Sequence, residues 1–238
     1  ELYFQPIVRA KDESLYAAEA LLRIHDKNGK FISPAEAIPI LEESGLIIPV
    51  GKWIIQNAFS MCTECRKYYP EFRVSINLSY VQILKSPLMM ELKQMIECSG
   101  ISCSGIIVEL TESGYLEGTP AVRSVWNDMK QLRIQIALDD FGTGYSNLMN
   151  ISNLEPDIVK LDRGFTLKAL SRSYEYQLMQ YVIEMVHKLN QYVCVEGVET
   201  KEDLEKIKAL GPDLIQGYYY SKPCSRDEFL KKFFGHSE

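Results

Sequence analysis

Several features that would assign a chain to a common class are missing from this sequence. It contains no run of about 18 apolar residues, the length that spans a bilayer, because Pro49 and Lys52 interrupt its most apolar segment, Gly45–Ile55. We therefore expect no membrane contact from this segment. Basic residues are not in excess, since the net charge is -6 and the pI is about 5.3. A broad basic surface for a DNA or RNA polymer is therefore not expected.

Histidine is scarce, and the six cysteines are scattered along the chain. Because His25, His187 and His236 are far apart in the sequence, a histidine-based metal site is not expected. The cysteines are too sparse for a disulfide framework, and the lone Cys62–Cys65 pair is more typical of incidental thiols than of a zinc or redox site. Any metal must therefore be held by oxygen. We expect a cytoplasmic location, although the full-length protein could be anchored in a membrane.

The rest of the sequence alternates between β-rich runs and helical patterns. The β-rich runs predict strands at Leu2–Val8, Leu15–Arg23, Phe72–Leu78, Gly105–Leu110, Gln135–Asp139, Asp157–Leu161, Tyr192–Glu196 and Leu214–Tyr218. The helical patterns predict helices at Ser33–Ser44, Pro49–Tyr69, Tyr80–Cys98, Thr119–Gln131, Ser171–Asn190, Lys201–Leu210 and Ser225–Phe234.

Two of the predicted helices carry cap signals. Ser33 is followed by Pro34 and by Glu36, a pattern that favours a capped first turn. Thr200 precedes a first turn that contains Asp203, and acidic residues are favourable at that end of a helix. Both residues are therefore predicted N-caps.

Eight strands separated by helices favour a (β/α)8 TIM-type barrel over an open doubly wound sheet. The first two strands are separated only by the polar segment from Arg9 to Ser14, whereas a parallel crossover needs about a dozen residues or more. They should therefore form an antiparallel hairpin. Either the barrel contains one antiparallel strand, or the first strand lies outside it.

Polar side chains recur at the ends of the predicted strands. They are Glu19, Asn77, Glu109, Asp139, Asp140, Lys160, Glu196 and Gln216. Because a barrel collects its chemistry at the carboxyl ends of its strands, we expect these side chains at one mouth. A charge among such apolar neighbours is costly unless it is paired or binds a metal. The alternative for any single residue is a solvated carboxylate or an ordinary turn.

Several carboxylates at one mouth would repel each other unless cations compensate them. Hard divalent ions suit oxygen ligands, so we expect Mg²⁺ or Mn²⁺, with Ca²⁺ as a further candidate that could inhibit. The adjacent Asp139 and Asp140 could serve two ions, and Asn77 offers an amide oxygen. Two ions about 3.5–4 Å apart form the clamp used for displacement at phosphorus. Gly142 and Gly144 then allow a tight loop beside the metals, or simply form a turn.

Seven motifs occur in a characteristic order: EALLR at 19–23, NLS at 77–79, VELTES at 108–113, ALDDFGTGYSNL at 137–148, PDIVKLD at 156–162, VEGVET at 195–200 and QGYYYSKP at 216–223. On these motifs, and on FQPIV at 4–8, the chain resembles the EAL-domain family. The resemblance implies a barrel with one antiparallel strand. It also implies a bacterial phosphodiesterase that hydrolyses cyclic di-GMP to linear 5'-pGpG through a hydroxide activated by two metal ions.

The resemblance also implies a role for each matching residue. One metal would be held by Glu19, Asn77, Glu109 and Asp139, and the second by Asp139 and Asp140 with Glu196 nearby. Lys160 matches the catalytic lysine, while Glu196 could be either base or ligand. Substrate contacts are implied for Gln5, Arg23 and Gln216, a loop-steadying role for Glu112 and Glu199, and a supporting position for Asp162.

The resemblance implies cyclic di-GMP as the ligand and a homodimer as the assembly. Residues 1–238 are expected to be a single domain excised from a larger protein with a fused sensor or cyclase domain. A receptor that binds cyclic di-GMP without cleaving it is the main alternative, and a scaffold for protein contacts is a third. Neither is favoured, because no expected metal ligand has been lost from the motifs.

Overall fold

The computed structural model describes residues 1–111, 119–143 and 154–235. Within these residues the strands close into a barrel in the order β1-β10-β9-β8-β7-β6-β5-β2. The barrel strands are β1 (Leu2–Arg9), β2 (Leu15–Leu22), β5 (Arg73–Asn77), β6 (Ile106–Thr111), β7 (Gln135–Phe141), β8 (Ile158–Leu161), β9 (Tyr192–Glu196) and β10 (Leu214–Gln216). The closed barrel confirms the predicted fold class and excludes the open sheet.

The reversed strand lies inside the barrel. β1 is antiparallel to both of its neighbours, β2 and β10, whereas the other neighbouring strands pair in parallel. The polar turn between β1 and β2 is closed by the Arg9 amide, which donates to the Ser14 carbonyl at 2.9 Å. The short connection predicted this hairpin, and the pairing with β10 settles where its first strand lies.

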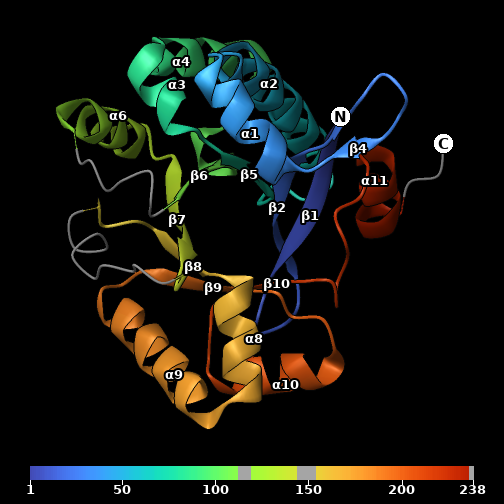
Figure 1. Cartoon of the computed structure of the whole chain (residues 1–238), viewed down its shortest axis with the longest axis vertical. Helices are drawn as coiled ribbons and strands as arrows, with labels where there is room; N and C mark the ends of the chain where they lie inside the picture. Colours follow the sequence, from blue (N-terminus) through green and yellow to red (C-terminus); the bar gives the residue numbers. More distant parts are fainter. Residues whose placement is uncertain (112–118, 144–153, 236–238) are drawn as a thin grey trace.

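Helices cover the barrel in two main groups (Figure 1). One group contains α1 (Pro34–Glu43), α2 (Ile47–Cys65), α3 (Tyr80–Lys85) and α4 (Leu88–Ser99), and the opposite group contains α8 (Arg163–Ser171), α9 (Ser173–Lys188) and α10 (Lys201–Ala209). The remaining described elements are α6 (Pro120–Gln131), α11 (Arg226–Phe234), the 3-10 turn η1 (Cys103–Gly105) and the small hairpin β3 (Ile24–His25) and β4 (Phe31–Ile32). In the part of the chain that is described, no helix is long and apolar enough to cross a membrane.

Three elements differ from the sequence predictions. The helix expected at 80–98 is split into α3 and α4, because Pro87 lacks an N–H group and Ser86 before it is extended. Helix α8 was not predicted, since Gly164 in its first turn weakens the helical signal. The hairpin β3–β4 was also missed, because two-residue strands carry no usable alternation.

The two predicted caps behave differently. Thr200 forms a full capping box, in which the Asp203 amide donates to Thr200 Oγ1 at 3.1 Å and the Thr200 amide donates to Asp203 Oδ2 at 2.9 Å. Ser33 stands at the N-cap of α1 with extended backbone, but its side chain makes no cap hydrogen bond. Only the Thr200 side chain therefore satisfies a free amide at its helix end.

This difference yields a stability prediction. Thr200→Ala should lower the free energy of unfolding by about 1 kcal/mol, because one helix amide loses its acceptor. Ser33→Ala serves as the matched control and should cost clearly less. Urea unfolding followed by circular dichroism measures both variants. Equal losses in the two would contradict this account of the caps.

Candidate active site

The strands bring polar side chains to one layer through a two-residue alternation. The barrel interior contains an apolar layer of Ile7, Tyr16, Ala17, Ile107, Ala137, Ile158, Cys194 and Leu214. Two positions further along their strands stand Glu19, Glu109, Asp139, Lys160, Glu196 and Gln216, and on the reversed strand Gln5 stands two positions before Ile7. Because alternate residues of a strand share a face, these polar groups all lie above the apolar layer.

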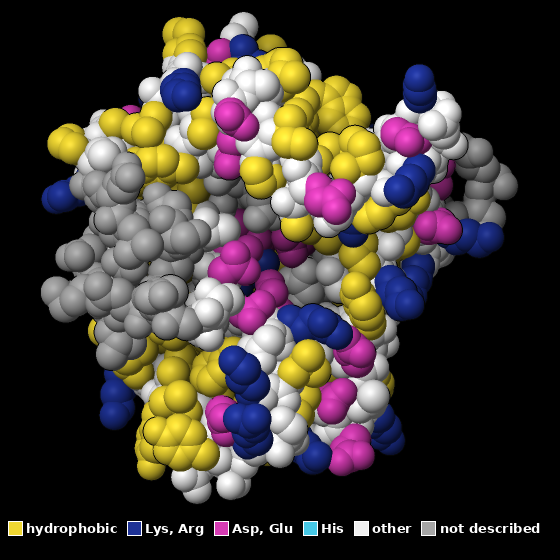
Figure 2. All heavy atoms as spheres, in the orientation of Figure 1, with side chains coloured by type: hydrophobic (Ala, Val, Ile, Leu, Met, Phe, Trp, Pro, Cys, Tyr) yellow, Lys and Arg dark blue, Asp and Glu magenta, His cyan; other side chains and the backbone are white. Residues whose placement is uncertain are grey.

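Lys160 lies at the centre of this polar layer, and its side chain is 2% exposed. Its Nζ atom is 2.7 Å from Glu109 Oε2 and 2.7 Å from Glu196 Oε1. It is also 3.3 Å from Asp139 Oδ1 and 3.4 Å from Glu19 Oε2. Figure 2 shows acidic side chains gathered in the central hollow of the molecule. One buried ammonium therefore collects four carboxylates from four different strands.

Neutral side chains complete the hydrogen bonding of this cluster. Glu19 accepts from Asn77 Nδ2 and from Gln216 Nε2, each at 2.7 Å. Gln216 Nε2 also donates to Gln5 Oε1 at 3.2 Å, and Gln5 Nε2 donates to the Ser221 carbonyl at 3.3 Å. These contacts place both glutamines and Asn77 beside Glu19, as expected for residues of one site.

Ser75 also contacts the cluster, through Glu109. It is completely buried on β5, and its hydroxyl donates to Glu109 Oε1. The sequence analysis missed this residue. Its signal was its position two residues before Asn77 on the same strand, which places it on the inward face.

The site holds more negative charge than one ammonium can balance. Burial raises the pKa of Glu109 well above its ordinary value, and the Glu19 carboxylate adds to this effect. Burial and the nearby Asp139 raise the pKa of Glu196 to about 8, even though Lys160 opposes the shift. Burial would lower the pKa of Lys160, but the surrounding carboxylates outweigh it and hold that pKa well above its usual range. The ammonium therefore stays charged, while Glu109 and Glu196 bind protons more readily than ordinary carboxylates.

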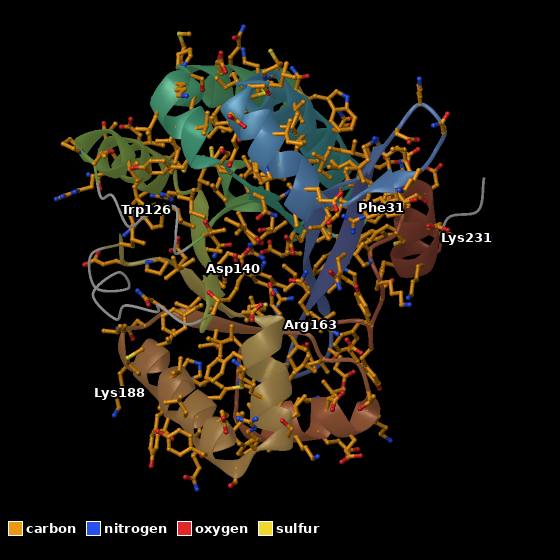
Figure 3. The ribbon with its side chains drawn as sticks, viewed as in Figure 1. Phe31, Trp126, Asp140, Arg163, Lys188 and Lys231 are labelled. Carbon is orange, nitrogen blue, oxygen red and sulfur yellow. The ribbon has the colours of Figure 1, made fainter. Side chains whose placement is uncertain are left out.

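A bulge brings the second aspartate toward the same region. The pairing of β7 with β8 shifts register between Leu138 and Phe141, and Asp140 has a φ of 59°. Burial raises the pKa of Asp140 to about 6, and the carboxylate of Asp139 adds to the shift. Figure 3 shows Asp140 at the inner side of the barrel. Adjacent residues on an uninterrupted strand would instead face opposite sides.

Gly142 follows this bulge and allows its close packing. Its φ is 104°, and a Cβ atom there would lie 2.8 Å from the Phe165 ring. This contact fits the tight loop expected after the two aspartates. The second glycine of that motif, Gly144, lies outside the described residues, as does Glu112.

The donor set fits a hard divalent cation. Asp139 Oδ1 lies 3.3 Å from Lys160 Nζ but outside hydrogen-bond geometry. Among the described groups, no donor makes a hydrogen bond to this oxygen or to Gln216 Oε1. In residues 1–111, 119–143 and 154–235, no three Asp, Glu, His or Cys side chains converge at metal-ligand spacing. The oxygens instead surround an ammonium at 2.7–3.4 Å, whereas Mg²⁺ requires about 2.0–2.1 Å. The residues fit a metal in kind, provided that Lys160 withdraws and the carboxylates close in.

Two cavities open onto this cluster and share Glu19 and Leu21 in their walls. The first has a volume of about 240 Å³ and is lined by Gln5, Glu19, Asp139, Lys160, Glu196 and Gln216, together with Arg163, Glu199 and Tyr218. The second has a volume of about 550 Å³ and includes Asn77 and Arg23 in its wall. The two cavities therefore adjoin at Glu19, beside the carboxylate cluster.

Two predicted supporting residues lie just outside the cluster. Asp162 is the N-cap of α8, where its Oδ1 accepts from the amides of Gly164 and Phe165 at 2.7 and 3.3 Å. Glu199 Oε1 accepts hydrogen bonds from Nε and Nη2 of Arg163, at 3.1 and 2.7 Å. Arg163 was not predicted as a site residue. Its only signal was its place directly after the PDIVKLD motif.

Comparison with known proteins shows the family of the chain. The EAL domain family profile matches residues 1–223. The chain belongs to the EAL domain family.

The curated relatives include characterised and uncharacterised proteins. The uncharacterised protein y4lL of Sinorhizobium fredii is 34% identical over 239 residues, which are 100% of this chain and 28% of that protein. Cyclic di-GMP phosphodiesterase PdeF of Escherichia coli is 31% identical over 222 residues, which are 93% of this chain and 30% of that protein. The chain thus spans less than a third of the length of these two relatives.

Among solved structures, the EAL enzyme Bd1971 in its cAMP- and cyclic-di-GMP-bound form is 31% identical in sequence. The match has a TM-score of 0.93 and covers 98% of this chain and 64% of that one. The barrel thus has a close structural counterpart in a protein described in a form bound to cAMP and cyclic di-GMP.

The central ammonium leads to a stability prediction. Lys160→Met, measured with a chelator present so that no divalent ion replaces the lost charge, should lower the free energy of unfolding by about 3 kcal/mol. The matched control is Lys208→Met, whose Nζ lies 3.0 Å from Glu13 Oε1 at the surface. An exposed pair of this kind contributes about 1 kcal/mol or less. Similar small losses in both variants would show that Lys160 does not stabilise the cluster.

Proposed function

We propose that this chain is a divalent-metal-dependent phosphodiesterase that hydrolyses cyclic di-GMP to linear 5'-pGpG. The observation that carries the proposal is the convergence of Glu19, Glu109, Asp139 and Glu196 on one buried cationic centre between two cavities. Membership of the EAL domain family and the named activity of the relative PdeF support the same conclusion.

The metal ligands proposed here are those that the family resemblance implies, and the donor set supports them in kind. Glu19, Asn77, Glu109 and Asp139 would hold one Mg²⁺ or Mn²⁺ ion, and Asp139 and Asp140 would hold a second, with Glu196 nearby. In the structure, Asn77 Nδ2 donates a hydrogen bond to Glu19. A role as a metal ligand therefore requires the amide to rotate so that its oxygen faces the ion. When bound, such ions offset phosphate charge and lower the pKa of water.

The remaining residues act on the substrate and on protons. The Lys160 ammonium, once drawn away from the carboxylates, can donate to the oxygen on which negative charge develops. Glu196, if it is not a metal ligand, would accept a proton from attacking water once bound cations offset the burial and the Asp139 charge that raise its pKa. Arg23 presents a planar guanidinium in the larger cavity, with Cζ 5.5 Å from the centre of the Tyr3 ring, and this shape suits a phosphodiester. The amides of Gln5 and Gln216 border the smaller cavity, where they can orient the substrate.

The chain spans 28% of y4lL and 30% of PdeF, and a fused sensor or cyclase domain in the full-length protein stays an expectation from the family resemblance. Homodimer formation remains an expectation from the family resemblance. Light scattering on the purified chain would test it directly.

The decisive assay combines the purified chain with cyclic di-GMP in separate Mg²⁺, Mn²⁺, Ca²⁺ and chelator arms, followed by chromatography. We expect 5'-pGpG with Mg²⁺ or Mn²⁺ and none with the chelator or with Ca²⁺ alone, and Ca²⁺ added to the Mg²⁺ arm should inhibit product formation. An inert mixture in every arm at micromolar enzyme would contradict the proposal. Tight calorimetric binding without any product would instead identify a cyclic di-GMP receptor.

Two variants separate metal binding from chemistry. Lys160→Ala should reduce kcat at least about 100-fold while cyclic di-GMP binding is retained, because its charge acts on the reacting phosphate. Glu19→Ala should weaken Mn²⁺ binding as well as turnover. Calorimetry measures the Mn²⁺ affinity independently of activity. Glu205→Ala, an exposed carboxylate 4.0 Å from Lys201 on α10, is the control and should change neither. Unaltered Mn²⁺ affinity in Glu19→Ala would remove Glu19 from the ligand set.

A further inference from the structure

Arg163 is a cation at the rim of the smaller cavity. It is the first residue of α8, and its side chain is 57% exposed. Figure 3 shows it at the end of α8 that faces the centre of the barrel. In Figure 2 basic side chains border the acidic hollow on this side. The residue therefore lies where a ligand entering the cavity would meet it.

The backbone and side chains around Arg163 hold it in this position. Gly197 has a φ of 79°, and a Cβ atom there would lie 2.4 Å from Arg163 Cγ. The arginine stem thus packs over a residue that must remain glycine. Among the described groups, Glu199 is the acceptor for the guanidinium, and one of its oxygens receives both Nε and Nη2. Two residues of the loop after β9 therefore position this arginine.

Arg163 is the accessible positive charge of the smaller cavity. Its described wall contains the carboxylates Glu19, Asp139, Glu196 and Glu199, and its other cation is Lys160, which is buried among carboxylates. An anion in this cavity would be repelled unless a cation faced it. The pair with Glu199 does not prevent this role, because an exposed ion pair contributes about 1 kcal/mol or less and is easily exchanged.

The larger cavity has a matching arrangement. Among the described residues that line it, Arg23 is the one basic side chain. Each of the two cavities that share Glu19 therefore has one accessible guanidinium. A ligand with two phosphodiesters that extends across the cluster would meet an arginine on either side.

Building on the proposed function, we propose that Arg163 binds the phosphodiester of the cyclic dinucleotide that is not cleaved. The scissile phosphodiester lies at the carboxylate cluster near Lys160, and the other lies at the rim of the smaller cavity, where Arg163 stands. A guanidinium fork can donate two parallel hydrogen bonds to phosphate oxygens, which fixes the orientation of the ring as well as its affinity. Arg163 is then a binding and specificity residue for substrates with a second phosphate.

The test compares two substrates that differ in this second charge. Arg163→Ala should raise KM for cyclic di-GMP about 10- to 100-fold with little change in kcat, since it removes a charged hydrogen bond made equally before and during reaction. With bis(p-nitrophenyl) phosphate, which has a single phosphodiester, the KM should not change. Arg163→Lys should recover part of the lost affinity, because it restores the charge without the fork.

Two further variants exclude indirect effects. Arg172→Ala removes an exposed arginine that pairs with Glu175 outside both cavities, and the KM for cyclic di-GMP should be unaffected. Glu199→Gln should raise this KM less than Arg163→Ala does, because the guanidinium remains in place. An equally large effect of Glu199→Gln would show that Arg163 acts only by holding its loop.

The outcomes separate this inference from the proposed function. An inert wild-type chain on both substrates would reject the phosphodiesterase activity itself. Hydrolysis by the wild type with an unchanged KM for cyclic di-GMP in Arg163→Ala, or with equal KM changes for both substrates, would overturn the role of Arg163 alone.

Discussion

The structure depends on a buried ammonium that is surrounded by carboxylates. Lys160 Nζ lies within 3.4 Å of oxygen atoms from Glu19, Glu109, Asp139 and Glu196. So many like charges cannot be buried together without a positive charge among them. Because a divalent ion supplies more charge at shorter range, the same oxygens are suited to exchange the ammonium for metals. The buried charge cluster of the barrel is thus also its candidate catalytic centre.

The barrel makes this cluster possible through strand geometry. Alternation along each strand leaves an apolar layer, which includes Ile107, Ala137 and Ile158, beneath the polar one. A shift of one residue in any strand would turn its functional side chain toward the helices. Asp140 is the exception, because the register shift in β7 and its φ of 59° interrupt the regular alternation, and the Asp139 charge acts on its carboxyl group. The same alternation along the strands therefore produces both the packed apolar layer and the polar layer of the site.

The sequence predicted the barrel and most of the cluster because both depend on local patterns. The six-residue turn from Arg9 to Ser14 predicted the reversed strand, and regular polar strand ends predicted the mouth. It could not predict that Lys160 would occupy the centre, because this depends on how a long side chain folds back among four strands. Nor could it pair Arg163 with Glu199, since their contact joins positions 36 residues apart. The role of Glu112 remains a prediction from the family resemblance.

The most direct test is anomalous diffraction from crystals grown with Mn²⁺ and cyclic di-GMP. The account predicts two anomalous peaks among Glu19, Glu109, Asp139 and Asp140, with the Lys160 ammonium displaced from its present position toward the phosphate. The distance from Glu196 to the nearer peak would then distinguish a ligand from a base. Peaks elsewhere, with Lys160 still held by the four carboxylates, would contradict the central claim that this cluster is a divalent metal site.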